Sequence, residues 1–157
     1  MFIKKGIHKT MVNIKLKKIY KDAVIPSHGT QCAAGYDLYA YATNGGDILI
    51  PPHTTSKIGT GISMEITDGF FGAIFARSGI ATKRGLRPAN CVGVIDSDYR
   101  GEIIVALHND SDETQTVSNH ERIAQLVIIP YLPVHFVEVD SLDKTDRGNN
   151  GFGSTGV

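Results

Sequence analysis

The sequence predicts an all-β domain, either a sandwich, a jelly roll or a barrel, on the basis of three observations. Short runs of apolar and β-branched residues recur along the chain, and several of them alternate with period two. Turn sequences at residues 44–47, 68–69 and 109–112 separate these runs. A single stretch has the composition of a helix. At 157 residues, the chain is long enough for one domain with one hydrophobic core.

The expected strands divide into two kinds. Residues 12–16 and 60–66 alternate apolar and polar side chains, whereas the other runs are rich in β-branched and aromatic residues. Those runs are residues 70–75, 103–107, 123–129 and 134–139. Period two places Arg122, Ala124 and Leu126 on one face of a strand and Ile123, Gln125 and Val127 on the other. If Gln125 is buried, it needs hydrogen-bond partners from a ligand or from neighbouring backbone.

The composition of residues 78–85 predicts the one short helix. Ser78 is a candidate N-cap, and Gly85 is a typical C-terminal glycine. Arg77, the Ser78 hydroxyl and the free N–H groups of the first turn would form a small anion site. An ordinary helix cap with a surface arginine explains the same residues.

Residues 90–104 predict a β-hairpin, with residues 96–101 near its bend. Asp96 follows the apolar pair Val94-Ile95, where a carboxylate would be partly desolvated and could hold and polarise a water molecule. Alternatively, Asp96, Ser97 and Asp98 are simple turn residues, because Asx side chains stabilise turns.

The last eleven residues, 147–157, are rich in glycine and predict either a lid that orders on a nucleotide or a flexible end. Arg147, Phe152 and two hydroxyl residues could contact phosphates and a flat ring. The spacing of Gly148, Gly153, Ser154 and Thr155 nearly matches a phosphate loop. The lysine of that motif is absent, however, and no helix can follow, which excludes the P-loop fold.

Composition and charge exclude several classes of protein. Sixteen basic and sixteen acidic side chains balance, so we expect no nucleic-acid or membrane partner. The sequence shows neither a secretory signal nor a run of eighteen apolar residues. Cys32 and Cys91 are far apart, which favours small buried residues over a disulfide or a zinc site. We therefore expect a reducing, cytoplasmic setting, or a nuclear one if the chain is eukaryotic or viral.

Five segments in order, at residues 34–40, 76–79, 90–101, 122–125 and 147–156, together resemble the five motifs of the trimeric dUTP pyrophosphatases (dUTPases). The resemblance extends from residue 13 to 156. The tail reads Arg-Gly-x-x-Gly-Phe-Gly-Ser-Thr-Gly, and the predicted hairpin reads Gly-Val-Ile-Asp-x-Asp-Tyr-Arg-Gly. One position differs, because His120 precedes Glu121 where the family commonly has glycine. His120 must therefore tolerate a positive φ or reshape the turn.

The resemblance implies a homotrimer of distorted jelly-roll subunits with one short helix. Residues 1–10 would be an extension, residues 11–146 the jelly-roll domain and residues 147–157 a lid that reaches a neighbouring subunit's site. The implied reaction is Mg²⁺-assisted attack of water on the α-phosphorus of dUTP, which yields dUMP and pyrophosphate. It would limit uracil in DNA and supply dUMP for thymidylate synthesis.

The resemblance also implies a role for each matching residue. Asp96 would orient and activate the attacking water. Asp37 would support the hydration shell of the metal ion. The residues that would contact uracil and deoxyribose are Asn90, Val94, Ile95, Tyr99, Ile104 and Phe152. Those that would bind phosphates are Arg77, Ser78, Gly79, Gln125, Arg147, Gly153, Ser154 and Thr155.

Three other functions stay open from the sequence. A dCTP deaminase, or a bifunctional deaminase and dUTPase, could share the scaffold, with Glu102 as the one candidate for the additional acid/base in the hairpin. A dUTP-responsive regulatory protein is the second. A structural jelly roll without a ligand is the third, and it leaves the ordered motifs unexplained.

Overall fold

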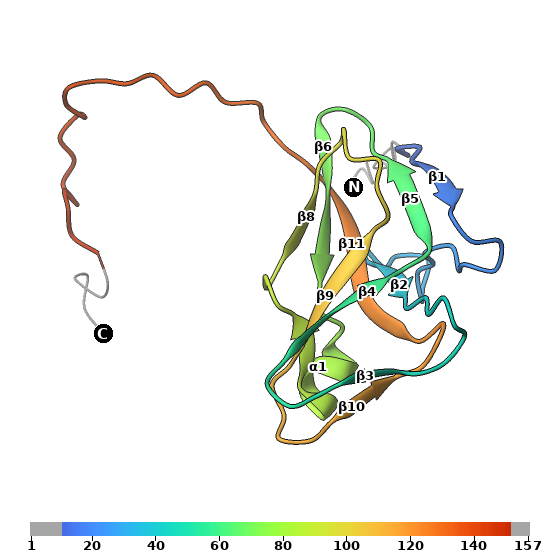
Figure 1. Cartoon of the computed structure of the whole chain (residues 1–157). Helices are drawn as coiled ribbons and strands as arrows, with labels where there is room; N and C mark the ends of the chain where they lie inside the picture. The colour runs from blue at the N-terminus through green and yellow to red at the C-terminus, as the bar shows by residue number, and fades with distance from the viewer. Residues whose placement is uncertain (1–10, 152–157) are drawn as a thin grey trace, which may run out of the picture.

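The computed structural model describes residues 11–151, and this part of the chain contains eleven short strands and one helix. Figure 1 shows that they form one β-rich body, with α1 near the end where β3 and β10 lie. In chain order the elements are β1 (Lys15–Lys18), β2 (Tyr36–Tyr39), β3 (Ile48–Ile50), β4 (Thr55–Gly59), β5 (Ile62–Glu65), β6 (Phe70–Phe75), α1 (Ser78–Arg84), β7 (Leu86–Pro88), β8 (Gly93–Ile95), β9 (Ile104–Asn109), β10 (Gln115–Val117) and β11 (Arg122–Pro130).

The strands form four antiparallel sheets in which neighbouring strands are mostly distant in sequence. A four-stranded sheet has the order β2-β11-β6-β8, and a three-stranded sheet has the order β4-β9-β7. The pairs β1-β5 and β10-β3 complete the body. This arrangement is a distorted jelly roll with one short helix, as the resemblance implied.

The hydrophobic core lies between these sheets. Its fully buried members come from both larger sheets and from the shorter ladders, so folding joins all four. The largest of them are Leu38, Ile50, Ile58, Ile62, Leu86, Ile103, Leu107 and Ile123. Burying one such side chain contributes about 1.5–3 kcal/mol, which makes this core the main favourable term in folding.

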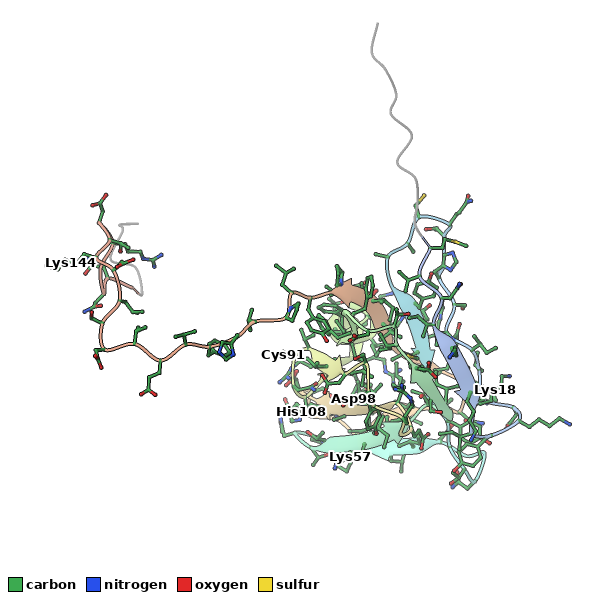
Figure 2. All side chains as sticks on the ribbon, turned by 90° about the horizontal axis from the view of Figure 1, so that it is seen from above. Lys18, Lys57, Cys91, Asp98, His108 and Lys144 are labelled. Atoms are coloured by element: carbon green, nitrogen blue, oxygen red, sulfur yellow. The ribbon has the colours of Figure 1, made fainter. Side chains whose placement is uncertain are left out.

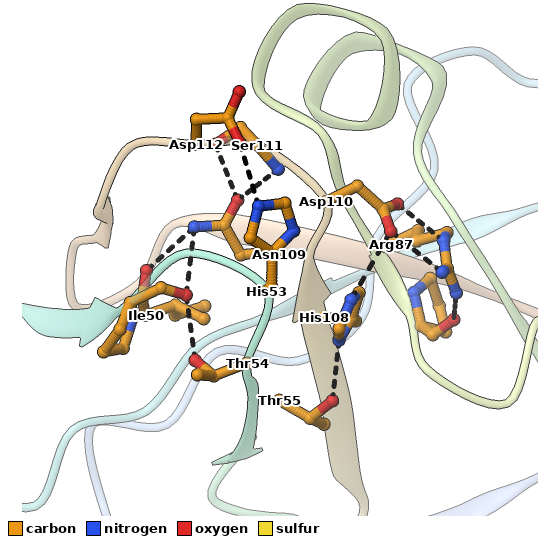
Figure 3. A network of polar contacts seen from close by, with 12 residues as sticks. Ile50, His53, Thr54, Thr55, Arg87, His108, Asn109, Asp110, Ser111 and Asp112 are labelled. Carbon is orange, nitrogen blue, oxygen red and sulfur yellow. Dashed lines mark hydrogen bonds and ion pairs between the residues drawn. The ribbon is translucent and has the colours of Figure 1, made fainter.

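A polar network closes the end of the body where β9 meets the turn between β3 and β4 (Figure 3). Asn109 is fully buried, and its Nδ2 donates to the carbonyl oxygens of Ile50, Pro51 and Glu113 at 2.7–3.2 Å. Its Oδ1 accepts from the backbone N–H and the hydroxyl of Ser111. Every polar group of this amide is therefore used, as burial requires.

Arg87 and Asp110 form a two-pronged ion pair beside this network. Nε and Nη2 of Arg87 donate to the two carboxylate oxygens of Asp110 at 2.7 and 2.9 Å. The guanidinium lowers the pKa of the Asp110 carboxyl below its usual value, and the carboxylate raises the pKa of Arg87. The pair joins β7 to the end of β9.

Most predicted strands are confirmed, but the run at residues 134–139 forms none. These residues are extended and exposed, and no strand of the described chain lies beside them. An extended segment becomes a β-strand only when another backbone pairs with it, and residues 11–151 offer no such partner there. Figure 1 shows the segment after β11 leaving the body.

Two smaller expectations were also wrong. The period-two face of β11 is interrupted, because a β-bulge between Arg122 and Ala124 leaves Ile123 and Ala124 both buried. Cys32 and Cys91, expected to be buried, are both exposed free thiols. No helix of the described residues is long and apolar enough to cross a membrane.

Candidate active site

The strand registers bring three of the predicted site residues together at the end of β6. Gln125 of β11 lies opposite Asp37 of β2 and also opposite Phe75 of β6. Arg77 follows Phe75 by two residues, and its Nε donates to Asp37 Oδ1 at 2.7 Å. Nη1 of Arg122 donates to the other carboxylate oxygen of Asp37 at 3.3 Å.

Asp37 therefore holds two arginines at once. Its side chain is only 15% exposed, so these charge-assisted bonds act in partly desolvated surroundings. Because Nε of Arg77 is occupied, the direction of its guanidinium is set by the carboxylate. The carboxylate oxygens keep lone pairs for further donors, such as a water molecule.

Gln125 obtains its partner from the backbone. Its Nε2 donates to the carbonyl oxygen of Ala76 at 2.8 Å, which ties β11 to the start of α1. Its Oε1 lies against Gly35, where an added Cβ would come within 2.5 Å of that oxygen. A side chain at position 35 would therefore displace the amide of Gln125.

The helix α1 begins one residue earlier than the sequence indicated. Arg77 occupies the N-cap position, with no side-chain hydrogen bond, and Ser78 is the first helical residue. The predicted Ser78 cap is therefore wrong, because the extended backbone conformation belongs to Arg77. Ser78 and Gly79 are exposed. The predicted end is confirmed, since Gly85 is left-handed at φ 66° and closes the last turn.

The predicted hairpin at residues 90–104 is only partly present. β7 and β9 pair antiparallel and form its base. β8, however, pairs with β6 of the other sheet and not with β9. The segment from Asn90 to Ile103 is therefore an excursion between two sheets. The alternation of apolar and polar residues could not show whether β8 would pair with β6 or with β9, because either pairing would bury Gly93.

The bend of this excursion, at residues 97–102, is held by its own side chains. The Tyr99 hydroxyl donates to the carbonyl oxygen of Glu102 at 3.1 Å, and an added Cβ at Gly101 would meet that hydroxyl. Arg100 donates to the carbonyl oxygen of Ser97 at 2.6 Å. The Glu102 carboxylate accepts from the backbone N–H of Gly61 at 2.8 Å, which fastens the bend to the turn between β4 and β5.

Asp96, which follows β8, lines an open hollow of about 580 Å³. Phe71, Val94, Ser97, Asp98 and Tyr131 also line it. Val94 is 59% exposed and Asp96 is exposed, so the expectation of a buried apolar pair before the carboxylate was wrong. Asn90 and Ile104 are exposed as well. A second hollow of similar size lies across Ser97 and Asp98, against β1 and β5.

The described residues thus hold two separate clusters. Asp96 and its neighbours form one, and Asp37, Arg77, Arg122 and Gln125 form the other; no residue of the second lines the hollow. In the described part of the chain, no three His, Cys, Asp or Glu side chains gather as metal ligands would. Arg147 lies in the extended segment, and its Nε donates to the carbonyl oxygen of Asn150. Phe152, Gly153, Ser154 and Thr155 lie outside the described residues.

A dUTPase family model matches residues 21–156, which span both clusters. The chain belongs to the dUTPase family. It is 45% identical over 145 residues to the deoxyuridine 5′-triphosphate nucleotidohydrolase of Nautilia profundicola, which covers 92% of this chain and 99% of the relative. The enzyme of the same name from Desulfitobacterium hafniense is 46% identical over 149 residues, 93% of this chain and 97% of that one.

Solved dUTPase structures share the fold. A mutant dUTPase of Staphylococcus bacteriophage 80alpha with dUpNHpp superimposes with a TM-score of 0.79 at 26% identity, covering 92% of this chain and 99% of that one. A mutant dUTPase of phage phi11 of S. aureus, described with a structural Mg(II) ion, has a TM-score of 0.74 at 20% identity, over 84% and 99%.

The dUTPase motif with the unusual histidine keeps its backbone shape. His120 has φ 63°, so it adopts the left-handed conformation for which glycine is better suited. Its N–H donates to the carbonyl oxygen of Ala40 at 2.9 Å, and this bond helps to hold the turn.

Sequence reasoning missed the aromatic wall of the hollow and the role of Arg122. Phe71 and Tyr131 pack edge to face with ring centres 6.5 Å apart beside the loop of Asp96. Phe71 lies near the beginning of β6, and Tyr131 directly follows β11. Only the pairing of these two strands predicts that the two rings are close together. Arg122 could have been found only by knowing that β2 and β11 are neighbours.

Proposed function

We propose that this chain hydrolyses dUTP to dUMP and pyrophosphate. The observation that carries the proposal is the position of Asp96, an exposed carboxylate at the edge of an open hollow. The curated relatives named above, which are nucleotidohydrolases of deoxyuridine triphosphate, support the same reaction. The phage 80alpha enzyme, solved with dUpNHpp, supports dUTP as the substrate.

In the proposed mechanism, Asp96 accepts a hydrogen bond from a water molecule and directs its oxygen at the α-phosphorus. As the P–O bond forms, the carboxylate takes the proton, and the bond to the pyrophosphate leaving group breaks. A general base needs only to lie within hydrogen-bond reach of its water. The loop fastened at Glu102 and Tyr99 provides a fixed position for that purpose.

The loop around Asp96 would also select the nucleotide. We propose that Asn90 and the backbone of Val94, Ile95 and Ile104 bind the uracil edge, and that Phe152 stacks on the base. Tyr99, held over Gly101, would contact the deoxyribose face and leave no space for a 2′-hydroxyl. Cytosine would be rejected because its donors and acceptors do not match a site built for uracil.

The second cluster would hold the phosphates. Arg77, Ser78, Gly79 and Gln125 would contact the α- and β-phosphates, and Arg147 with Gly153, Ser154 and Thr155 would close on the γ-phosphate. Mg²⁺ bound to the triphosphate would neutralise charge as it develops on the phosphate oxygens. Asp37 fits a supporting place for that ion, because lone pairs beyond its two arginine bonds can accept from a metal-bound water.

We further propose that the chain acts as a homotrimer, with residues 147–157 as a lid. The two clusters are separate within one chain, so a neighbouring subunit would complete each site. The segment after β11 supports this proposal, because Leu132, Val134, Phe136, Val137 and Leu142 are all strongly exposed. Such a contiguous apolar surface favours burial against another copy.

The deaminase alternative is not favoured. Its one candidate acid/base, Glu102, is occupied by the N–H of Gly61 and lies against Gly59, away from the hollow of Asp96. A regulatory role could accompany turnover but explains none of the site geometry. The two exposed thiols favour a reducing location, and we propose the cytoplasm, or the nucleus in a eukaryotic or viral setting.

The test is pyrophosphate release with dUTP, dTTP, dCTP and UTP side by side in magnesium. We expect rapid release from dUTP and at least about a hundredfold less from each of the others. Ammonia or a uracil nucleotide formed from dCTP would support the deaminase alternative. Equal rates with dUTP and UTP would contradict the role of Tyr99.

A further inference from the structure

The helix α1 is fastened at its C-terminal end by a single arginine. Nη1 of Arg84 donates to Glu121 Oε1 at 2.5 Å, and its Nε donates to Gln115 Oε1 at 3.1 Å. Its Nη2 donates to the carbonyl oxygen of Thr116. All three nitrogens are thus engaged by β10 and by the residue that precedes β11. At 26% exposure, the side chain is well shielded from solvent.

The acceptor is itself fixed. The second oxygen of Glu121 accepts from the backbone N–H of Ser118 at 3.0 Å, and the Glu121 N–H donates to the carbonyl oxygen of Ser118. Glu121 is therefore a rigid part of the turn between β10 and β11. A guanidinium that binds it becomes fixed relative to β11.

Consecutive residues at the beginning of β11 hold both ends of α1. Glu121 contacts Arg84 in the last turn, and Arg122 contacts Asp37, which in turn holds Arg77 at the N-cap. The helix has only seven residues, of which Ile80 is the one that is buried, and the carbonyl oxygen of Gly85 after its last turn accepts from the N–H of Asp110 at 2.9 Å. A helix this short has little stability of its own, so tertiary contacts decide its orientation.

We propose that Arg84 is a positioning residue for the hydrolysis of dUTP. By clamping the last turn of α1 to Glu121, it sets the orientation in which Arg77, Ser78 and Gly79 meet the substrate phosphates. Arg84 itself touches no substrate. This inference rests on the proposed function, because it assigns Arg84 a role only if those residues bind a triphosphate.

The experiment compares Arg84→Met and Arg84→Lys with the control Arg87→Met. Methionine keeps the apolar stem, whereas lysine keeps the charge and loses the fork. Arg87 is an apt control because its guanidinium also forms an ion pair, with Asp110, and is 39% exposed, but neither residue lines the hollow of Asp96 or binds Asp37. For each variant, kcat and KM for dUTP, the affinities for dUMP and deoxyuridine, and the thermal midpoint are measured.

We expect Arg84→Met to lose about 10- to 100-fold in kcat/KM, because misplaced phosphate contacts weaken both binding and the transition state. Arg84→Lys should recover part of the loss. The affinity for deoxyuridine, which carries no phosphate, should stay within about twofold, while that for dUMP falls. Arg87→Met should lower the thermal midpoint and keep kcat/KM within about twofold of wild type.

Three outcomes separate the inference from the function. If Arg84→Met lowers only the thermal midpoint, as Arg87→Met does, Arg84 is merely structural and the inference is wrong. If Arg84→Met does not fold, Arg84→Lys and Glu121→Gln decide, and unchanged kcat/KM in both would overturn it. A wild-type chain that releases no pyrophosphate from dUTP refutes the proposed function and this inference together, whereas active wild type with unaffected variants refutes the inference alone.

Discussion

At the scale of single residues, the two aspartates of the candidate site have opposite surroundings. Asp37 is mostly buried, and Arg77 and Arg122 neutralise its charge. Its carboxylate is therefore suited to orienting cationic groups. Asp96 is exposed at the edge of a hollow, so its oxygens are accessible to a water molecule and a substrate. This contrast supports the reacting role proposed for Asp96 and the supporting role proposed for Asp37.

Replacing Asp96 with Asn tests the first assignment. The amide keeps the shape of the side chain but cannot accept a proton from water, so we expect turnover of dUTP to fall by about 10²- to 10⁴-fold. Binding of dUpNHpp, measured by calorimetry, should be nearly unchanged, as should the thermal midpoint, because Asp96 is exposed. Unchanged turnover would remove Asp96 from the mechanism.

The ion pair of Asp110 with Arg87 predicts how the stability of the protein depends on pH. The hydrogen bonds and charge of Arg87 lower the pKa of the Asp110 carboxyl in the folded state below the usual value. The stabilisation is therefore complete above the pKa of an ordinary aspartate, about 3.9, and is lost as the pH falls through the lowered folded-state pKa. In Asp110→Asn, the stability deficit relative to wild type should be constant near neutral pH and shrink in acid.

Urea unfolding of Asp110→Asn at pH values from neutral down to acid would measure that deficit. The control is Asp47→Asn, which replaces another exposed carboxylate. A deficit that grows in acid would contradict the sign of the linkage, and an equal deficit in both variants would contradict its origin in Arg87.

At the scale of elements, the contacts that attach two short segments to the rest of the fold determine where their predicted site residues lie. α1 is tied to β11 through Gln125 at its beginning and through Glu121 at its end. The loop from Asn90 to Ile103 is tied to β6 by the pairing of β8 and to the turn before β5 by Glu102. Each carries predicted site residues, and each is held by a few polar contacts.

The segment after β11 behaves differently, and truncation tests its role. Figure 2 shows Lys144 well away from the body that carries Cys91, Asp98 and His108. A variant ending at Asp146 should keep the thermal midpoint and the circular dichroism spectrum of the full chain, because Arg147 contacts only Asn150 in the described residues. Its dUTP turnover should fall at least about a hundredfold, since the closing phosphate contacts are lost. Unfolding of this variant would make the tail structural and reject the lid.

At the scale of the whole molecule, the segment after β11 is extended and apolar, and no strand within residues 11–151 pairs with it. Phe136 is 90% exposed and Leu142 is 86% exposed, whereas the core of the body contains large aliphatic side chains, such as Leu38 and Leu107, that are fully buried. Exposing such residues to water is unfavourable, so a second copy that covers them would stabilise the assembly.

Phe136→Asp tests that assembly directly. Light scattering of the wild type should give three times the 17.0 kDa mass of one chain. The aspartate would place a charge in an apolar contact, so we expect a lower mass that depends on concentration, with the spectrum of the folded body retained. Glu138→Gln, on the same segment, should remain trimeric. A trimer that persists in Phe136→Asp would show that this segment does not hold the subunits together.

Local patterns predicted much of this architecture. The apolar runs of β6, β9 and β11 follow from β-branched composition, and the end of α1 follows from Gly85, which adopts the left-handed backbone that glycine permits. For His120 the motif left two possibilities, a positive φ or a reshaped turn, and the structure shows the positive φ. These features depend on a few neighbouring residues, so they can be predicted from the sequence alone.

The contacts between residues that are far apart in the chain could not be predicted from the sequence. That β8 joins β6 and not β9, that Arg122 reaches Asp37 across 85 positions, and that Arg84 clamps Glu121 all depend on which surfaces the core brings together. The exposure of Cys32, Cys91 and Val94 depends on the same packing. A single sequence determined the strands β5, β6, β9 and β11, the helix end and the family through short-range chemistry. Only the tertiary structure decided the contacts between distant residues, because closing those loops is favourable only when the whole core forms at once.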